Sequence, residues 1–219
     1  MVTDYHDDGN LSKAVDRLRA KLIGGRLCLD FVNTVGGRAG GTVIRDKIAG
    51  FLDLVAWSLL AGIVDASGAR ALARRAARSA VEAAATLARA VQFREALYRI
   101  LLCVVEGRRP AEADVDVLRR EVSMVRAHER LSARGGAFVW TLPERMDALD
   151  RVLWPVSLSA AELLTSGELS RLRQCGGETC SWMFLDTTRN CSRQWCDMRD
   201  CGNRAKVRRF REKRRGGRA

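Results

Sequence analysis

Residues 171–215 read RLRQCGGETCSWMFLDTTRNCSRQWCDMRDCGNRAKVRRFREKRR and hold five of the seven cysteines of the chain. Four of these form two C-x4-C pairs, Cys175 with Cys180 and Cys196 with Cys201, with fifteen residues between the pairs. That separation is enough for a hairpin that folds one pair over the other. Four thiolates in a tetrahedron are the ligands of a structural zinc ion, with no position left for a substrate. Cys191 lies between the pairs and is not predicted to be a ligand.

Two disulfide bonds are the alternative explanation for the same four cysteines. The first residues, MVTDYHDDGN, are polar and acidic and lack the apolar segment of a signal peptide. A chain that stays in the reducing cytosol keeps its thiols, which favours a metal site and a cytoplasmic location. Because the cysteine module is too small to bury much apolar surface, zinc should supply much of its folding free energy. Replacing Cys196 with Ser should then unfold this module without melting the rest of the chain.

The residues that follow Cys201 predict a basic helix. Val207 and Phe210 are its only large apolar residues and are expected to hold it against the cysteine module. Helical spacing places the basic residues in two stripes, Arg204, Arg208, Arg211 and Arg215 in one and Lys206, Arg209 and Lys213 in the other. From residue 171 onward there are fourteen Arg and Lys against five Asp and Glu, which is most of the chain's net charge of +12. This clustering predicts a polyanionic partner.

The same stretch resembles the CGNR zinc-finger family. The resemblance rests on the following elements: the first Cys-x4-Cys pair, Phe184-x-Asp186, Asn190, Trp195-Cys196 and the block Cys201-Gly-Asn-Arg-x-Lys206. Bacterial members join this finger to an N-terminal ABATE domain and are described as stress-induced transcription regulators. The resemblance implies one structural zinc ion held by Cys175, Cys180, Cys196 and Cys201. Gln194 stands where members often carry a basic residue before the tryptophan, so one expected positive contact with DNA is weakened.

Length and composition allow one main domain and one small additional module. The chain has 219 residues, of which 47% are hydrophobic, too many for a disordered protein. An uninterrupted apolar run of about twenty residues, which a membrane span needs, does not occur in the sequence. We therefore predict a flexible segment 1–20, a mostly helical ABATE-like domain 21–166 and a finger with a basic helix 167–215.

The predicted fold class is mainly α with a small β-hairpin or sheet, an α+β arrangement, followed by a small treble-clef-like zinc finger. Apolar periodicity predicts helices over residues 10–20, 46–61, 68–78, 80–106, 111–132 and 146–165, with a break near Pro155. Residues 27–32 and 137–142 are predicted to be strands. Pairing them with each other is the simplest way to supply hydrogen-bond partners for the backbone groups at their edges. Strand periodicity also covers residues 182–185 of the finger.

Three polar residues beside the first predicted strand are candidates for a small-ligand pocket. The run L-x-L-D-F-V-N-T is similar to the start of an ABATE domain, and it places Asp30 and Asn33 close to Arg26. In one interpretation the three side chains line the pocket of a sensor domain. In the other, which we favour, Asp30 caps a turn or pairs with Arg26 and has only a structural role.

Two functional hypotheses follow. The first is a bacterial transcription regulator that binds DNA through the zinc finger, with the N-terminal domain as a sensing or dimerising module that takes a small-molecule effector or forms a homodimer. Its candidate DNA contacts are Arg193, Arg204, Lys206, Arg208, Arg209, Arg211 and Arg215. The second is a zinc-stapled module that binds RNA or an acidic protein without reading a DNA sequence. An enzyme is not expected, because a site closed by four cysteines has no free coordination position.

Overall fold

The computed structural model describes residues 4–18, 20–38, 43, 45–142 and 148–216. Its α-helices are α1 (Asp4–Leu18), α2 (Leu27–Val32), α3 (Phe51–Leu60), α4 (Ala66–Arg78), α5 (Ala80–Val105), α6 (Glu112–Arg126), α7 (Trp154–Thr165) and α8 (Asn203–Gly216). Shorter helical turns are η2 (Leu149–Leu153), η3 (Gly167–Arg171) and the π-helical η4 (Met198–Gly202). Antiparallel strand pairs are β1 (Val35–Gly36) with β2 (Arg45–Asp46), β3 (Arg130–Arg134) with β4 (Ala137–Thr141), and β5 (Leu172–Gln174) with β6 (Met183–Leu185). The predicted fold class is confirmed.

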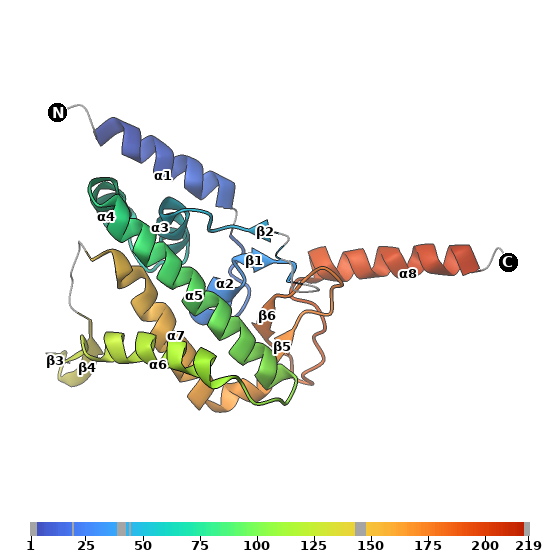
Figure 1. Cartoon of the computed structure of the whole chain (residues 1–219). Helices are drawn as coiled ribbons and strands as arrows, with labels where there is room; N and C mark the ends of the chain where they lie inside the picture. Colours follow the sequence, from blue (N-terminus) through green and yellow to red (C-terminus); the bar gives the residue numbers. More distant parts are fainter. Residues whose placement is uncertain (1–3, 19, 39–42, 44, 143–147, 217–219) are drawn as a thin grey trace.

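Helix α5 is the central element of the N-terminal domain. It packs against α2, α3, α4 and α6, while α7 packs against α2 and α6 (Figure 1). The centre of the core is aromatic, because the ring of Phe31 lies 5.1 Å from that of Trp57 and 6.1 Å from that of Phe93. The helices over α3, α4, α5 and α6 were predicted from apolar periodicity, which is a strong signal in elements of ten residues or more.

The strand predicted over residues 27–32 is wrong, because these residues form helix α2. Cys28, Leu29, Phe31 and Val32 are all buried, so α2 is covered on more than one side by α5, α7 and β6. In a short, fully buried apolar run, strand and helix cannot be separated by periodicity. The alternation that favoured a strand therefore carried no information on the conformation.

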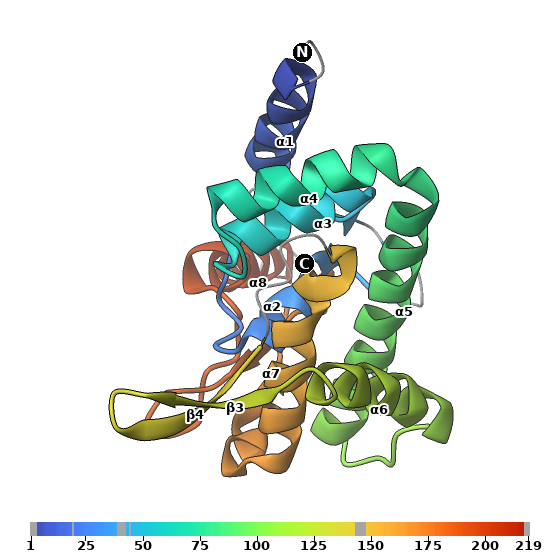
Figure 2. The same cartoon turned by 90° about the vertical axis from the view of Figure 1, so that its left-hand side faces the viewer.

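The predicted pairing of residues 27–32 with residues 137–142 is also wrong. Strand β4 instead pairs with β3, in register from Arg130 opposite Thr141 to Arg134 opposite Ala137. The turn between them consists of Gly135 and Gly136, with φ angles of 58° and 82°. Positive φ at both central residues suits the tight turns of β-hairpins, and glycine adopts it without steric cost. The hairpin projects from the helical body (Figure 2), and it replaces the last turns of the helix predicted over 111–132.

The predicted break near Pro155 occurs at the start of α7. Helix α7 begins at Trp154, so Pro155 stands in its first turn, where a missing backbone N–H disrupts no hydrogen bond. The short turn η2 precedes it and buries Leu149, Val152 and Leu153. The first part of the helix predicted over 146–165, up to residue 147, lies outside the described residues.

The segment predicted to be flexible at the N-terminus contains helix α1. Leu11, Ala14 and Leu18 are buried, and α1 packs against α3 and α4. The amphipathic pattern predicted for residues 10–20 is therefore present, in a helix that begins earlier. Because its apolar face belongs to the main core, α1 is part of the folded body.

The finger is attached to this body by its own apolar side chains. Leu172, Met183 and Leu185, from the β5–β6 hairpin, lie in the same buried cluster as the helices of the N-terminal domain. The finger and the N-terminal domain therefore share one hydrophobic core. Beyond the finger, α8 extends away from the body and carries the C-terminal end of the chain (Figure 1).

Candidate metal centre and basic helix

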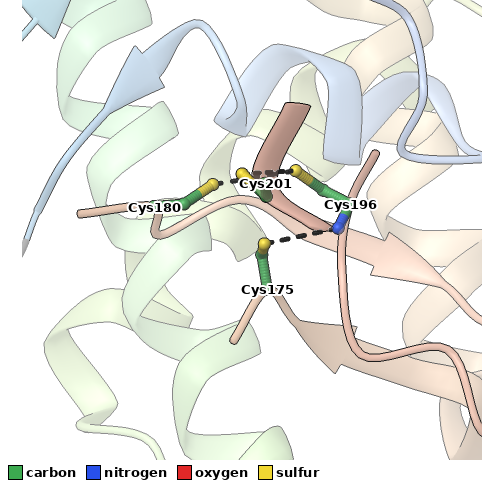
Figure 3. Close-up of side chains that lie close together, drawn as sticks. All are labelled: Cys175, Cys180, Cys196 and Cys201. Carbon is green, nitrogen blue, oxygen red and sulfur yellow. Dashed lines mark hydrogen bonds between the residues drawn. The ribbon is translucent and has the colours of Figure 1, made fainter. Parts of the chain in front are cut away.

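The four cysteines of the two C-x4-C pairs converge on one point (Figure 3). Cys175 follows β5, Cys180 and Cys196 lie in loops, and Cys201 lies in η4. Their four sulfur atoms lie within 4.8 Å of one another, and Cys196 Sγ is 3.7 Å from Cys180 Sγ and 3.6 Å from Cys201 Sγ. Sulfurs at about 2.3 Å from a tetrahedral zinc ion are about 3.8 Å apart. All four cysteines are free thiols, and the site fits one structural zinc ion.

Local backbone geometry explains why glycines accompany these cysteines. A Cβ on Gly177 would lie 3.0 Å from Cys180 Cβ, 3.4 Å from Cys201 Sγ and 3.6 Å from Cys175 Sγ. A Cβ on Gly202 would lie 2.9 Å from Met198 Sδ. The turn at Gly177 can therefore approach the sulfur atoms closely only because this residue has no side chain, whereas Gly202 leaves room for the side chain of Met198.

The electrostatics of the cluster couple metal binding to the release of protons. Hydrogen bonds with Cys180 and Cys196 lower the pKa of Cys175, so this thiol ionises first. The bond with the Cys175 thiolate raises the pKa of Cys196, and the same contact raises that of Cys180. A metal-free cluster thus keeps protons on Cys196 and Cys180 at neutral pH. Zinc binding must release them, which makes the affinity for zinc increase with pH.

Arg193, which stays a predicted DNA contact, is engaged inside the finger. Its guanidinium lies 4.4 Å from the centroid of the Phe184 ring, and its Nε donates to the carbonyl oxygen of Trp195 at 2.9 Å. A second nitrogen donates to the carbonyl oxygen of Cys196. Arg193 therefore holds the loop that carries one metal ligand. The buried Asp186 carboxylate supports the same loop by accepting from the backbone N–H groups of Thr188 and Arg193.

The basic residues that form the two predicted stripes of α8 divide into two groups in the structure. Arg204 donates to Cys201 Sγ at 3.1 Å and pairs with Asp200, and Arg208 pairs with Glu178 and Glu212. These two arginines face the finger. Four further residues, Lys206, Arg209, Arg211 and Lys213, are exposed and form no salt bridge with the described part of the chain. The side chain of Arg215 lies outside the described residues.

The apolar residues of α8 do not hold it to the finger as predicted. Val207 is 42% exposed and Phe210 is 60% exposed, whereas Ala205 is 4% exposed. The contact between helix and finger therefore lies at the first turns alone. The sequence could not distinguish this arrangement, because the small Ala205 is a weaker apolar signal than Val207 or Phe210.

The three residues proposed for a ligand pocket have three separate structural partners. Arg26 pairs with Glu168, and Asp30 accepts from the backbone N–H of Gly24 at 2.8 Å. Asn33 is buried and both donates to and accepts from the backbone of Met183, at 2.8 Å in each case. Asp30 thus caps a turn, as the favoured interpretation held. The geometry does not support a pocket shared by these residues.

Asn33 is one of several groups that join the finger to the N-terminal domain. Leu185 N–H donates to the Gly24 carbonyl at 2.9 Å, and the indole N–H of Trp182 donates to the Val35 carbonyl at 3.1 Å. On the other strand of the hairpin, Gln174 donates to the Tyr98 hydroxyl at 3.0 Å. None of these contacts can be predicted from the sequence, because each pairs residues that are far apart in the chain.

Two family models match the chain in consecutive segments. Residues 25–167 match the ABATE model, described as "Putative stress-induced transcription regulator", and residues 171–214 match the model of the CGNR zinc finger. A search of curated proteins gave no match. Among the described residues, each helix is too short or too polar to cross a lipid bilayer.

Proposed function

Because the chain belongs to the ABATE family and ends in a CGNR zinc finger, we propose that it is a transcription regulator that binds DNA through α8. The observation that carries this proposal is the exposed basic surface of α8. Eight of its fourteen residues are Arg or Lys and only one is Glu. Zinc would act by fixing the finger from which this helix projects.

The shape of α8 suits a DNA groove. An α-helix with side chains is about 10–12 Å across, and the major groove of B-DNA is about 12 Å wide. Since α8 is attached at its base alone, its remaining turns are accessible over most of their circumference (Figure 1). Lys206, Arg209 and Lys213 recur at helical spacing and form one stripe that would contact phosphates.

A salt titration on random duplex DNA tests this proposal. About six phosphate contacts predict a slope of about −5 for log affinity against log salt concentration. The variant Lys206→Ala, Arg209→Ala, Lys213→Ala should lose about two to three units of this slope. The control variant Arg70→Ala, Arg78→Ala, Arg120→Ala removes three charges from the N-terminal domain. Its slope should equal that of the unchanged protein. A shallow slope that is the same in all three proteins would contradict DNA binding by α8.

A zinc-stapled module that binds RNA or an acidic protein is the second candidate. The exposed Val207 and Phe210 favour it, because apolar side chains among cations suit an amphipathic partner. The two candidates differ in sequence preference. A regulator selects some duplexes from a randomised pool at fixed salt, whereas a cationic module enriches none of them.

We propose no catalytic role for the metal, since four thiolates complete the coordination of zinc. The N-terminal domain would act as the sensing or dimerising part of the regulator. Light scattering of the zinc-loaded protein tests dimerisation directly. A cytoplasmic location stays a prediction.

A further inference from the structure

The β3–β4 hairpin presents an apolar face to solvent. Side chains alternate along each strand, and the register places Leu131 beside Trp140 and Ala133 beside Phe138 on one face. Phe138 is 74% exposed, Trp140 is 65% exposed and Leu131 is 57% exposed. Neither strand makes more than slight contact with another element of the described chain, and the hairpin projects from the body (Figure 2). We call these four residues the hairpin face.

A hairpin of this kind lacks the support that two strands need in water. Three or more strands with an apolar face, or packing against a helix, are required for independent stability. Strands β3 and β4 form a sheet of two strands and pair with no third strand in the described part of the chain. The apolar contacts that stabilise such a sheet are therefore missing from a single copy, which indicates that another molecule supplies them.

The position of the charges indicates what kind of molecule fits. By the same alternation, Arg130 and Arg134 lie on the other face of β3, away from the aromatic rings. A nucleic acid would need cations and rings on one surface, because its phosphates and bases are contacted together. The hairpin face itself carries no charge. It therefore fits an apolar surface.

A second copy of the hairpin supplies such a surface. Neither copy brings a charge into the contact, and a two-fold axis keeps the arginines of both copies on the outside. The exposed parts of Phe138 and Trp140 amount to about 300 Å² per copy. With Leu131, Ala133 and the neighbouring backbone, two copies would bury about 1,000 Å² in total, which is the lower limit for a specific interface. An interface of this size predicts a dissociation constant of about micromolar order.

We propose that the chain forms a two-fold dimer in which the hairpin faces of two copies pack against each other. Each hairpin is then one layer of a small sandwich, with aromatic rings from both copies between the layers. Helix α8 lies at the other end of the molecule (Figure 1), so the dimer leaves the basic helix of each copy accessible. The inference rests on the dimerising role proposed above for the N-terminal domain and does not depend on DNA binding.

Sedimentation equilibrium of the zinc-loaded full chain without DNA tests the proposal, at about 1–200 μM to bracket the expected affinity. The unchanged protein should pass from monomer to dimer across this range. The variant Phe138→Thr, Trp140→Thr keeps good strand-forming residues and removes both rings, so the dissociation constant should rise about 100-fold or more. Both side chains are exposed in the single copy and lie outside its core, so the variant should fold.

The matched control is Arg130→Thr, Arg134→Thr, which changes two residues on the opposite face of the same hairpin. It should leave the dissociation constant within about three-fold. Hydrogen–deuterium exchange locates the contact. Amides of residues 130–141 should exchange more slowly at high protein concentration, because the dimer stabilises the hairpin, whereas amides of α5 should not change.

Three results would overturn the proposal. The first is a monomer at every concentration, and the second is equal weakening of the dimer by both variants. The third is a monomer that binds phosphatidylglycerol vesicles through Phe138 and Trp140, since the partner of the hairpin face would then be a lipid surface. The salt slope on DNA is measured separately. A monomer that keeps a steep slope would contradict this inference alone and leave the proposed DNA contact of α8 intact.

Discussion

Asn33 shows how a single side chain can replace a strand. Its amide makes the two hydrogen bonds to Met183 that a neighbouring β-strand would otherwise supply, and it is 2% exposed. Met183 lies in β6, one of the strands of the finger. The residue therefore satisfies the open side of a two-stranded ribbon and fastens it to α2.

Asn33→Ala should lower the free energy of unfolding by about 2–4 kcal/mol, because it leaves the buried N–H and carbonyl of Met183 without partners. Urea unfolding of the zinc-loaded protein measures this. Gln92→Ala, on the exposed side of α5, is the control and should change stability by about 0.5 kcal/mol or less. A loss below about 1 kcal/mol for Asn33→Ala would contradict the structural role of its amide.

Asp30 should make stability depend on pH. Burial raises the pKa of Asp30 to about 6, from 3.8 when unperturbed. The folded chain thus binds a proton more tightly than the unfolded chain, so this residue costs stability as pH rises from about 4 to about 6. Asp30→Asn keeps an oxygen for the Gly24 N–H and removes the charge. Its stabilising effect over wild type should be about 1 kcal/mol larger at pH 7.5 than at pH 5, and an equal effect at both would contradict the raised pKa.

At the scale of elements, α8 is unusual because it packs only at its base. Ala205 is buried, Arg204 and Arg208 pair with the finger, and the later turns contact little else. A helix without tertiary packing has low stability against local opening, and neighbouring like charges lower it further. We expect residues 209–214 to be marginally stable in the free protein.

Hydrogen–deuterium exchange measured by mass spectrometry checks this expectation. Backbone amides of residues 209–214 should exchange within seconds in the free protein, and duplex DNA should slow them at least ten-fold by neutralising the repulsion. Amides of α5 provide the internal control and should be unaffected by DNA. Slow exchange of α8 in the free protein would show that an additional contact holds it.

The elements also show what the sequence could predict. The metal site could be predicted because the spacing of the cysteines is visible in the sequence, and because four thiolates are a typical ligand set of structural zinc. Helix α2 could not be predicted, since its buried apolar residues lie on more than one side of a helix of only six residues. The β3–β4 hairpin was missed because the helix predicted from residue 111 was extended to residue 132, across the start of β3, whereas the Gly135-Gly136 turn reverses the chain. The role of Arg193 inside the finger could not be predicted, because its stacking on Phe184 depends on a tertiary contact.

At the scale of the whole molecule, the finger and the N-terminal domain form one packed body. Leu172, Met183 and Leu185 from the finger lie in the main core, and hydrogen bonds from Trp182 and Leu185 cross the boundary. The sequence predicts a finger that unfolds by itself, because so small a module buries little apolar surface and depends on zinc for its folding. The shared core instead predicts that loss of zinc destabilises both parts together.

The zinc dependence of unfolding tests this coupling most directly. Calorimetry of the zinc-loaded protein should give one cooperative transition, and Cys196→Ser should shift the whole transition to a lower temperature. A decrease of about 4 kcal/mol in the free energy of unfolding corresponds to a decrease of about 10 °C in the midpoint temperature for a chain of this size. Cys191→Ser, which replaces an exposed cysteine outside the cluster, is the control and should leave the transition in place. Two separate transitions, with the N-terminal one unmoved by Cys196→Ser, would contradict the shared core.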